Sequence, residues 1–257
     1  MGGNAKLHPI HALWAHPRSM STALERVMRE RGDLDCVHEP FMYDYYIHRQ
    51  ERRMPMFDPE PGHPVTYSDV RAMLLERAVR GPVFFKDMSY YVMPHLLQDG
   101  FCDQITHAFL VRDPEASIVS YHKLDPDLSC IEIGLEAQWQ MYEALCARGA
   151  KPVVLRSEDV RADPVGVISA YWQAVGLKDK PLAFTWSDET PQDWQQVAGW
   201  HGAVMDSRAI RPLREDHKAQ QSERFEKAAR EAPQLRDMLD HHRPFYDKFC
   251  KIALTAD

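Results

Sequence analysis

Short apolar runs alternate with amphipathic stretches along this 257-residue chain. Five of the runs are too short for buried helices, and most end at proline, glycine or charged residues, which is typical of buried strands. These runs cover residues 10–15, 34–38, 82–86, 106–111 and 151–156. Between them, apolar residues recur at helical spacing, and a glycine follows each such stretch. The predicted helices cover residues 21–31, 68–80, 133–148 and 164–175.

Alternation of strands and helices favours parallel strands, because a crossover helix returns the chain to the same end of the sheet. We therefore expect an α/β fold of three layers, with an open, mainly parallel sheet of about five strands and helices on both faces. No linker-like stretch divides the chain, so we expect one domain over residues 1–257. The charged segment 213–257 is expected to be helical and to pack across one edge of the core.

Two long segments interrupt this alternation. Residues 42–66 are rich in tyrosine, arginine and proline, and residues 178–212 mix tryptophan, proline and charge. Excursions of this length inside a compact domain are commonly lids or binding loops. Irregular surface packing is the alternative, and the pattern does not decide between the two.

Composition narrows the range of partners. The net charge of −7 argues against nucleic acid or an anionic membrane as the main partner, although one local basic pocket for a small anion is still compatible with it. The five cysteines are odd in number and form no CxxC pair, which is typical of reduced thiols in the cytoplasm. No apolar run has membrane-spanning length, and the first residues lack the apolar core of a signal peptide. We expect a cytoplasmic protein without a membrane span.

Thirteen histidines raise the question of a metal site. They cluster only in "HPIH" near the start and in "DHH" at 240–242, and neither cluster has the carboxylate or cysteine spacing of a zinc site. We expect surface histidines and no metal.

The stretch "LWAHPRSMSTALERV" has the layout of a phosphate-binding loop, but it lacks the glycines and the Gly-Lys-Ser/Thr signature. In an open α/β sheet, ligands bind where strands end and helix N-termini present free N–H groups. Ser19, Ser21 and Thr22 stand at such a helix start, and Arg18 adds a planar cation suited to phosphate or sulfate oxygens. The alternative is a helix cap beside a solvated arginine. We expect Met20 at an ordinary negative φ, because the left-handed region costs a non-glycine residue about 1–2 kcal/mol.

A second polar element follows another strand, in "AFLVRDPEASIVSYHK". Pro114 suits the first position of a helix, with Asp113 as its N-cap, and Ser120 lies two turns into that helix. Arg112 and Ser120 are therefore candidates for gripping a second phosphate. A salt bridge at the strand end and a serine on the helix surface form the alternative.

Together these elements resemble the sulfotransferases that use 3′-phosphoadenosine 5′-phosphosulfate (PAPS). "HPRSMSTAL" is similar to the family's loop for the 5′-phosphosulfate, "VRDPEASIVS" to its 3′-phosphate element, and "VVLRSEDVRADP" to a third family stretch. The resemblance covers most of residues 10–177 in the right order. It implies a P-loop fold, no metal, and transfer of a sulfuryl group from PAPS to a hydroxyl of a small-molecule or carbohydrate substrate. The implied co-substrate contacts are Arg18, Ser19, Met20, Ser21, Thr22, Arg112 and Ser120.

The catalytic base is less plain from the sequence. Many family members carry Lys-Thr-His after the third strand, whereas "FFKDMSYY" keeps only Lys86 and has Asp87 next to it. The second strand ends in "CVHEPF", which resembles members that use a glutamate there as base, so Glu39 is the candidate and His38 and Asp87 are alternatives. A structural role, in which Glu39 pairs with Arg18 or caps a turn, stays open. We expect Arg18 and Lys86 to contact the transferring sulfuryl group.

Segment 42–66 directly follows the candidate base, so we expect it to form part of the site for the hydroxyl substrate. Its tyrosines are either stacking surfaces or core, and its arginines either meet an acidic group or lie in solvent. They are Tyr43, Tyr45, Tyr46, Arg49, Arg52 and Arg53. Two other functions stay open: a P-loop small-molecule kinase that uses ATP and Mg²⁺, and a non-catalytic nucleotide-binding homologue.

Overall fold

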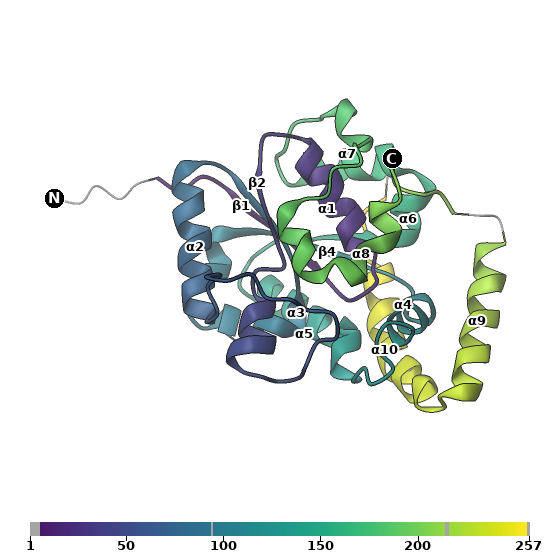
Figure 1. Ribbon diagram of the computed structural model, residues 1–257. Coiled ribbons are helices and arrows are strands. Elements are labelled where there is room, and N and C mark those ends of the chain that lie inside the picture. Colours follow the sequence, from purple (N-terminus) through teal and green to yellow (C-terminus); the bar gives the residue numbers. More distant parts are fainter. Residues whose placement is uncertain (1–5, 94, 214–215, 256–257) are drawn as a thin grey trace.

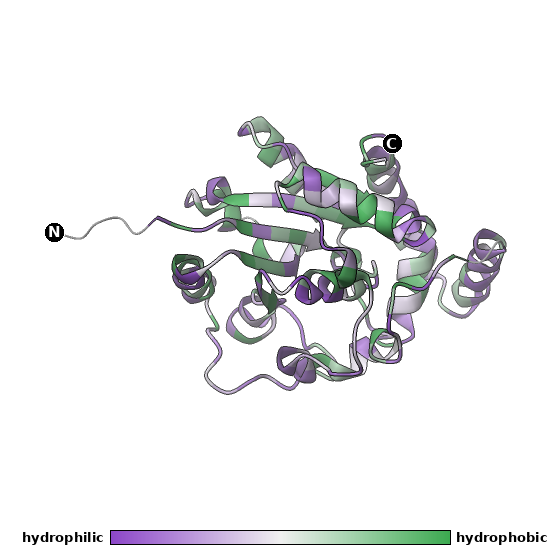
Figure 2. Ribbon diagram, turned by 90° about the horizontal axis from the view of Figure 1, so that it is seen from above, coloured by the Kyte–Doolittle hydropathy of each residue, from purple (hydrophilic) through white to green (hydrophobic). Residues whose placement is uncertain are grey.

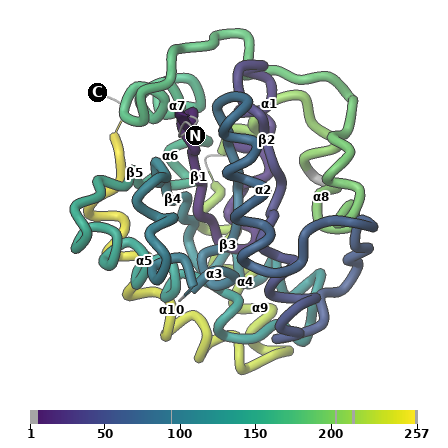
Figure 3. Tube along the Cα trace, turned by 90° about the vertical axis from the view of Figure 1, so that its left-hand side faces the viewer, coloured from purple at the N-terminus to yellow at the C-terminus, as the bar shows by residue number. Residues whose placement is uncertain are grey.

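The structure, a computed structural model, describes residues 6–93, 95–213 and 216–255. Five parallel strands form one sheet in the order β2-β3-β1-β4-β5 (Figures 1 and 3). The strands are β1 (Ile10–Ala15), β2 (Asp35–His38), β3 (Val83–Met88), β4 (Ile105–Val111) and β5 (Val153–Arg156). All five lie within two residues of the bounds expected from the apolar runs, so the predicted α/β fold is confirmed.

The α-helices are α1 (Ser21–Glu30), α2 (Tyr67–Arg80), α3 (Ser89–Val92), α4 (Pro114–His122), α5 (Leu135–Ala147), α6 (Ser157–Ala162), α7 (Pro164–Ala174), α8 (Ala198–Met205), α9 (His217–Glu231) and α10 (Gln234–Cys250). Shorter helical turns are η1 (Asp44–His48), η2 (His95–Leu97), η3 (Phe101–Gln104), η4 (Ile131–Ile133), η5 (Pro181–Phe184) and η6 (Gln192–Val197). The four helices predicted from apolar spacing correspond to α1, α2, α5 and α7. Among the described helices, none is long and apolar enough to cross a bilayer.

Three layers result because both faces of the sheet are apolar. Successive strand residues point to opposite faces, so Leu13 and Trp14 enter different cores. Leu13 packs in the core shared with α1 and α7, and Trp14 packs in the core shared with α2, α5 and α10. Figure 2 shows the strands between these helices.

Segment 213–257 is helical over α9 and α10, and its residues 214–215 and 256–257 lie outside the described residues. Helix α10 packs against α4 and α5, where Phe249 contacts Phe109 of β4 at a ring-centroid distance of 5.9 Å. These helices therefore extend the layer that covers one face of the sheet (Figure 1).

Segment 42–66 begins with the π-helical turn η1 and then runs without regular structure. Arg49 and Arg52 both form salt bridges with buried carboxylates. Neither is therefore a free surface cation. The three tyrosines of this segment are core residues, namely Tyr43, Tyr45 and Tyr46.

Candidate functional site

One pocket lies at the carboxyl ends of the strands, with a volume of about 190 Å³. Its walls are formed by the loop after β1, Glu39 after β2, the end of β3 and Arg112 after β4. One wall is polar. The rest of the lining is mainly aromatic and apolar, and its main residues are Tyr46, Met88, Tyr90, Tyr91, Tyr121 and Trp200.

The loop after β1 adopts an unusual backbone conformation. Arg18 and Met20 both have positive φ, 62° and 74°, so the expectation of a negative φ at Met20 is wrong. The turn is closed by hydrogen bonds from the Ser19 N–H to the His16 carbonyl (3.2 Å) and from the Ala23 N–H to the Met20 carbonyl (3.1 Å). The Met20 side chain also packs against the core beside α1, which offsets part of the roughly 1–2 kcal/mol cost of this conformation.

Two arginines meet at the polar wall. The Arg18 Nε donates to the Ser120 Oγ (3.0 Å), and the Arg112 Nη1 donates to the Arg18 carbonyl (2.7 Å). Burial lowers the pKa of both guanidinium groups, and the charge of Arg112 lowers the pKa of Arg18 further. Within the described residues, neither group lies within 4.0 Å of a carboxylate oxygen. Two desolvated cations without such a partner are suited to bind an anion.

The hydroxyl residues of the loop differ in position. Ser21 and Thr22 begin α1 and line the pocket. Ser19 is fully buried, does not line the pocket, and its hydroxyl has no hydrogen-bond partner in the described part of the chain. Ser120 lies behind Arg18. The predicted contact residues are thus close together, but Ser19 and Ser120 do not face the pocket directly.

Glu39 reaches the pocket from the end of β2, with a positive φ of 39° and 4% exposure. Strand β3 lies between β1 and β2, and the Glu39 carboxylate pairs with the Lys86 ammonium of β3 rather than with Arg18. Lys86 is fully buried and does not line the pocket. In this geometry the Lys86 ammonium contacts Glu39 rather than the pocket, and its expected direct contact with a transferring group stays a prediction.

The two alternative bases are held inside the core. The His38 Nδ1 lies 2.6 Å from the Glu25 Oε2, and burial, followed by the charge of Lys86, lowers the pKa of His38 to about 3. Asp87 accepts hydrogen bonds from two backbone N–H groups (2.7 and 2.9 Å), and burial raises its pKa well above the usual value. Of the three candidates, only Glu39 lines the pocket.

Helix α8 contributes three pocket residues that sequence reasoning missed, namely Trp200, His201 and Val204. The Trp200 carbonyl accepts a hydrogen bond from the Arg18 Nη1 (2.6 Å), and the His201 Nδ1 lies 3.5 Å from the Thr22 Oγ1. All three belong to segment 178–212, which the pattern marked only as an excursion. No motif surrounds His201, so its position depends on the tertiary fold.

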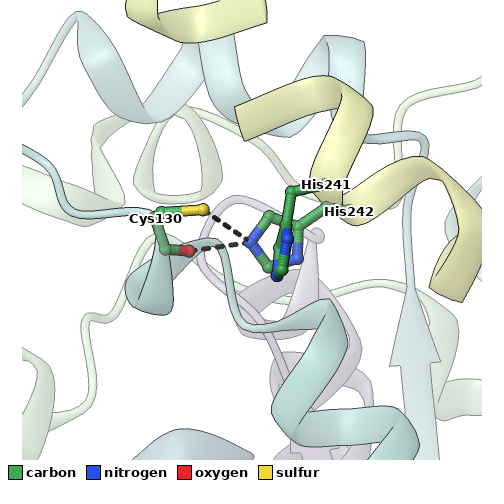
Figure 4. Close-up of side chains that lie close together, drawn as sticks. All are labelled: Cys130, His241 and His242. Carbon is green, nitrogen blue, oxygen red and sulfur yellow. Dashed lines mark hydrogen bonds between the residues drawn. The ribbon is translucent and has the colours of Figure 1, made fainter. Parts of the chain in front are cut away.

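A second histidine cluster lies outside the pocket (Figure 4). Cys130, His241 and His242 offer possible ligand atoms within 4.8 Å of one another. The His242 Nε2 donates to the Cys130 carbonyl (2.7 Å), and the His241 Nε2 lies 2.8 Å from the Glu136 Oε2. Both nitrogens thus already have protein partners. The absence of a bound metal stays a prediction.

Comparison with curated proteins gives distant relatives from a plant. The branched-chain-amino-acid aminotransferase-like protein 2 of Arabidopsis thaliana is 23% identical over 209 residues, which is 75% of this chain and 34% of that protein. The corresponding protein 1 is 23% identical over 213 residues, 77% of this chain and 36% of that protein. The chain spans about a third of the length of these relatives.

Solved structures and a family model both indicate a sulfotransferase domain. The sulfotransferase domain of the Synechococcus PCC 7002 olefin synthase has a TM-score of 0.51 at 16% identity, covering 89% of this chain and 97% of that domain. The sulfotransferase domain from the curacin biosynthetic pathway has a TM-score of 0.50 at 12% identity, with coverage of 86% and 98%. Both share the fold. A family model described as "Sulfotransferase domain" matches residues 10–217, which include all five strands, the Arg18 loop and α8. The chain belongs to the sulfotransferase domain family.

Proposed function

We propose that this chain transfers a sulfuryl group from PAPS to a hydroxyl group of a small molecule with an apolar body. One observation carries the proposal: two arginines that have no carboxylate partner among the described residues share one pocket with an aromatic lining and with the Glu39 carboxylate. An anion and an apolar substrate therefore have adjoining sites.

The residues present suit a nucleotide with two separated phosphates. Arg18, Ser21, Thr22 and the N-terminus of α1 would hold the phosphosulfate, because free N–H groups and the helix dipole favour an anion there. Arg112 would hold the 3′-phosphate from the end of β4, and Ser120 would support Arg18 and the same phosphate. Met20 would contribute the backbone of the turn.

The chemistry of transfer assigns a role to each charged group. The substrate oxygen attacks sulfur, a new S–O bond forms, and the bond between sulfur and the 5′-phosphate oxygen breaks. Arg18 stabilises the charge on the departing phosphate. The hydroxyl proton passes to the Glu39 carboxylate, and Lys86 positions that carboxylate through their ion pair. A general base of this kind contributes about 10²–10⁴-fold to the rate.

The pocket wall supports an apolar substrate over an acidic one. Tyr46 of segment 42–66 faces the pocket together with Tyr90 and Trp200. The nearby Arg49 and Arg52 are engaged by carboxylates of the protein and offer no basic surface to an acidic substrate. A carbohydrate, which also stacks on aromatic rings, is the alternative that the experiment tests.

Transfer of labelled sulfate from PAPS to phenol, an aliphatic alcohol and an amino sugar tests this function. We expect the phenol or the alcohol to be sulfated. Glu39→Gln should lower turnover by about 10²–10⁴-fold and leave the affinity for adenosine 3′,5′-bisphosphate nearly unchanged, since the amide cannot take the proton. Glu51→Gln, which removes an exposed partner of Arg49, is the control and should keep full activity. Loss of bisphosphate binding in Glu39→Gln would make Glu39 a structural residue.

A further inference from the structure

Three buried side chains form a hydrogen-bonded chain that ends at the pocket wall. The His38 Nδ1 lies 2.6 Å from the Glu25 Oε2, and the His38 Nε2 lies 3.0 Å from the His201 Nε2. Beyond it, the His201 Nδ1 faces the Thr22 hydroxyl at 3.5 Å. Glu25 and His38 are at most 1% exposed and His201 is 6% exposed, so water does not compete for these contacts.

The hydrogen bonds that join Glu25, His38 and His201 have a fixed direction. The Glu25 carboxylate only accepts, and its other oxygen already accepts from the Arg29 Nε and the Trp194 Nε1, both at 2.9 Å. The proton of His38 is therefore on Nδ1, and its Nε2 accepts. Burial lowers the pKa of His38 and of His201, so each ring carries a single proton.

The proton of His201 must then lie on Nε2, where it is donated to His38. Its Nδ1 is left as a bare hydrogen-bond acceptor at the pocket wall. The Thr22 hydroxyl, at 3.5 Å, is a weak partner for it.

A second hydrogen-bond acceptor, the Glu39 carboxylate, lies near the histidine pair. The Glu39 Oε1 lies 3.8 Å from the same His38 Nε2 that contacts His201. Glu39 and His201 thus both lie within 4 Å of one buried nitrogen, and both line the pocket. A hydroxyl group has only one hydrogen and can donate it to only one of them.

We propose that His201 is a specificity-determining residue that accepts a hydrogen bond from a second donor group on the substrate. On this assignment, which rests on the proposed sulfuryl transfer, one hydroxyl gives its proton to Glu39 and a neighbouring O–H or N–H donates to the His201 Nδ1. The substrate class is an apolar or aromatic alcohol with a donor group next to the hydroxyl that is sulfated. An analogue without that donor leaves a buried nitrogen unpaired.

Three phenols test the assignment in the wild-type protein. Catechol carries a neighbouring donor, guaiacol carries a neighbouring ether oxygen that only accepts, and phenol carries neither. We expect kcat/KM to be about 10–100-fold higher for catechol than for phenol, and lowest for guaiacol. Equal values for the three would overturn the assignment while leaving sulfuryl transfer intact. No sulfation of any alcohol would instead reject the proposed function.

Glu25→Gln should reverse the direction of the hydrogen bonds that join residue 25, His38 and His201. Because Arg29 and Trp194 both donate to one oxygen of Glu25, the amide oxygen must take that side and the amide NH₂ must face His38. His38 would then carry its proton on Nε2, and His201 would present N–H to the pocket. We expect the catechol preference to be lost and guaiacol to overtake phenol. A variant that keeps the wild-type order contradicts the inference.

Two further variants separate specificity from folding. Trp194→Phe removes one donor to Glu25 but leaves the hydrogen bond between Glu25 and His38, and its phenyl ring still packs against His38 and His201, so the catechol preference should persist. His201→Phe keeps a ring but no nitrogen, and the catechol-to-phenol ratio of kcat/KM should fall towards one even if Glu25→Gln does not fold.

Nitrogen NMR of histidine-labelled protein identifies the tautomers without any turnover. It should find His201 protonated on Nε2 in the wild type and on Nδ1 in Glu25→Gln. A wild-type His201 protonated on Nδ1 would reject the proposal directly.

Discussion

Five residues other than glycine have a positive φ in the described part of the chain, and three of them line the pocket. These are Arg18, Met20 and Glu39. Such conformations cost free energy and persist only where the surrounding contacts fix them, which is common at binding sites. The sequence identifies these residue types, but it does not predict their backbone conformation. The turn bonds around Met20 and the core contacts of its side chain exist only after folding.

Substitution of Met20 tests the backbone strain. Glycine adopts this conformation freely, whereas alanine keeps the penalty of about 1–2 kcal/mol. We expect Met20→Gly to melt a few degrees above Met20→Ala, since about 1 kcal/mol shifts the midpoint by roughly 2–4 °C in a chain of this size.

Calorimetry of both Met20 variants checks the order, with Ala23→Gly as the control. Ala23 lies in the first turn of α1 and is not among the residues with positive φ, so glycine there should lower the midpoint. Equal midpoints for the two Met20 variants would show that the turn carries no strain.

At the scale of elements, the strands and long helices follow from local periodicity, and the structure confirms them. Glu39 also lines the pocket although β3 separates β1 from β2, because the parallel strands end at one edge of the sheet, and its role as base stays a prediction. The contribution of α8 could not be predicted in this way. His201 is 163 residues from His38 and Trp200 is 182 residues from Arg18, and no local pattern encodes such contacts.

The start of α5 offers a test of how an element shapes the aromatic wall. Gly134 has a φ of 80°, and a Cβ there would lie 3.1 Å from the His16 Cβ and 3.2 Å from the Tyr90 Cδ1. Gly134→Ala should therefore add a clash with a pocket residue to the backbone penalty of about 1–2 kcal/mol. We expect a lower midpoint and a raised KM for the hydroxyl substrate, with bisphosphate affinity unchanged.

Gly149→Ala is the matched control for this prediction. Gly149 has a φ of 87°, but a Cβ at this position would have no neighbouring atom within 4 Å, so only the backbone penalty applies. If the two variants had the same midpoint and the same KM, contact between α5 and the aromatic wall would not matter.

At the scale of the whole molecule, several buried histidines couple stability to pH. Burial lowers the pKa of these side chains well below 6.5, for example to about 4 in His11, about 3 in His16 and about 4 in His107. Histidines of an unfolded chain take up protons near pH 6.5. Below that pH the unfolded state binds more protons than the folded state, so stability falls as the pH decreases from 6.5 towards 4. The full contribution of the neutral histidines to stability is present above pH 6.5. The residues are His11, His16, His38, His107, His201 and His242.

Urea unfolding at pH 7.5, 6.5 and 5.5 measures this coupling. Each such histidine should lower the free energy of unfolding by about 1.4 kcal/mol in total between pH 7.5 and 5.5. His107→Gln should reduce the slope, since His107 is buried and hydrogen-bonded to Trp14, whereas His241→Gln, at an exposed position, should not. A stability that does not change between pH 7.5 and 5.5 would contradict the neutral state of the buried histidines.

The net charge of −7 and the local pair of arginines act in opposite directions on an anionic ligand. The overall negative charge disfavours anionic partners in general, whereas the two arginines favour an anion inside the pocket. This excludes neither a sulfotransferase nor a kinase, because both bind a nucleotide. The two differ in which nucleotide fits Arg18 and Arg112.

Thermal melting with nucleotides tests whether the pocket binds a nucleotide that carries a 3′-phosphate. Adenosine 3′,5′-bisphosphate is compared with ATP plus Mg²⁺ and with 5′-AMP. At about 100 times its dissociation constant a ligand adds about 2.7 kcal/mol, which is a rise of several degrees for this chain. We expect that rise with the bisphosphate alone, and its loss in Arg18→Ala and Arg112→Ala. A rise with ATP and Mg²⁺ alone would contradict the account and make this protein a kinase.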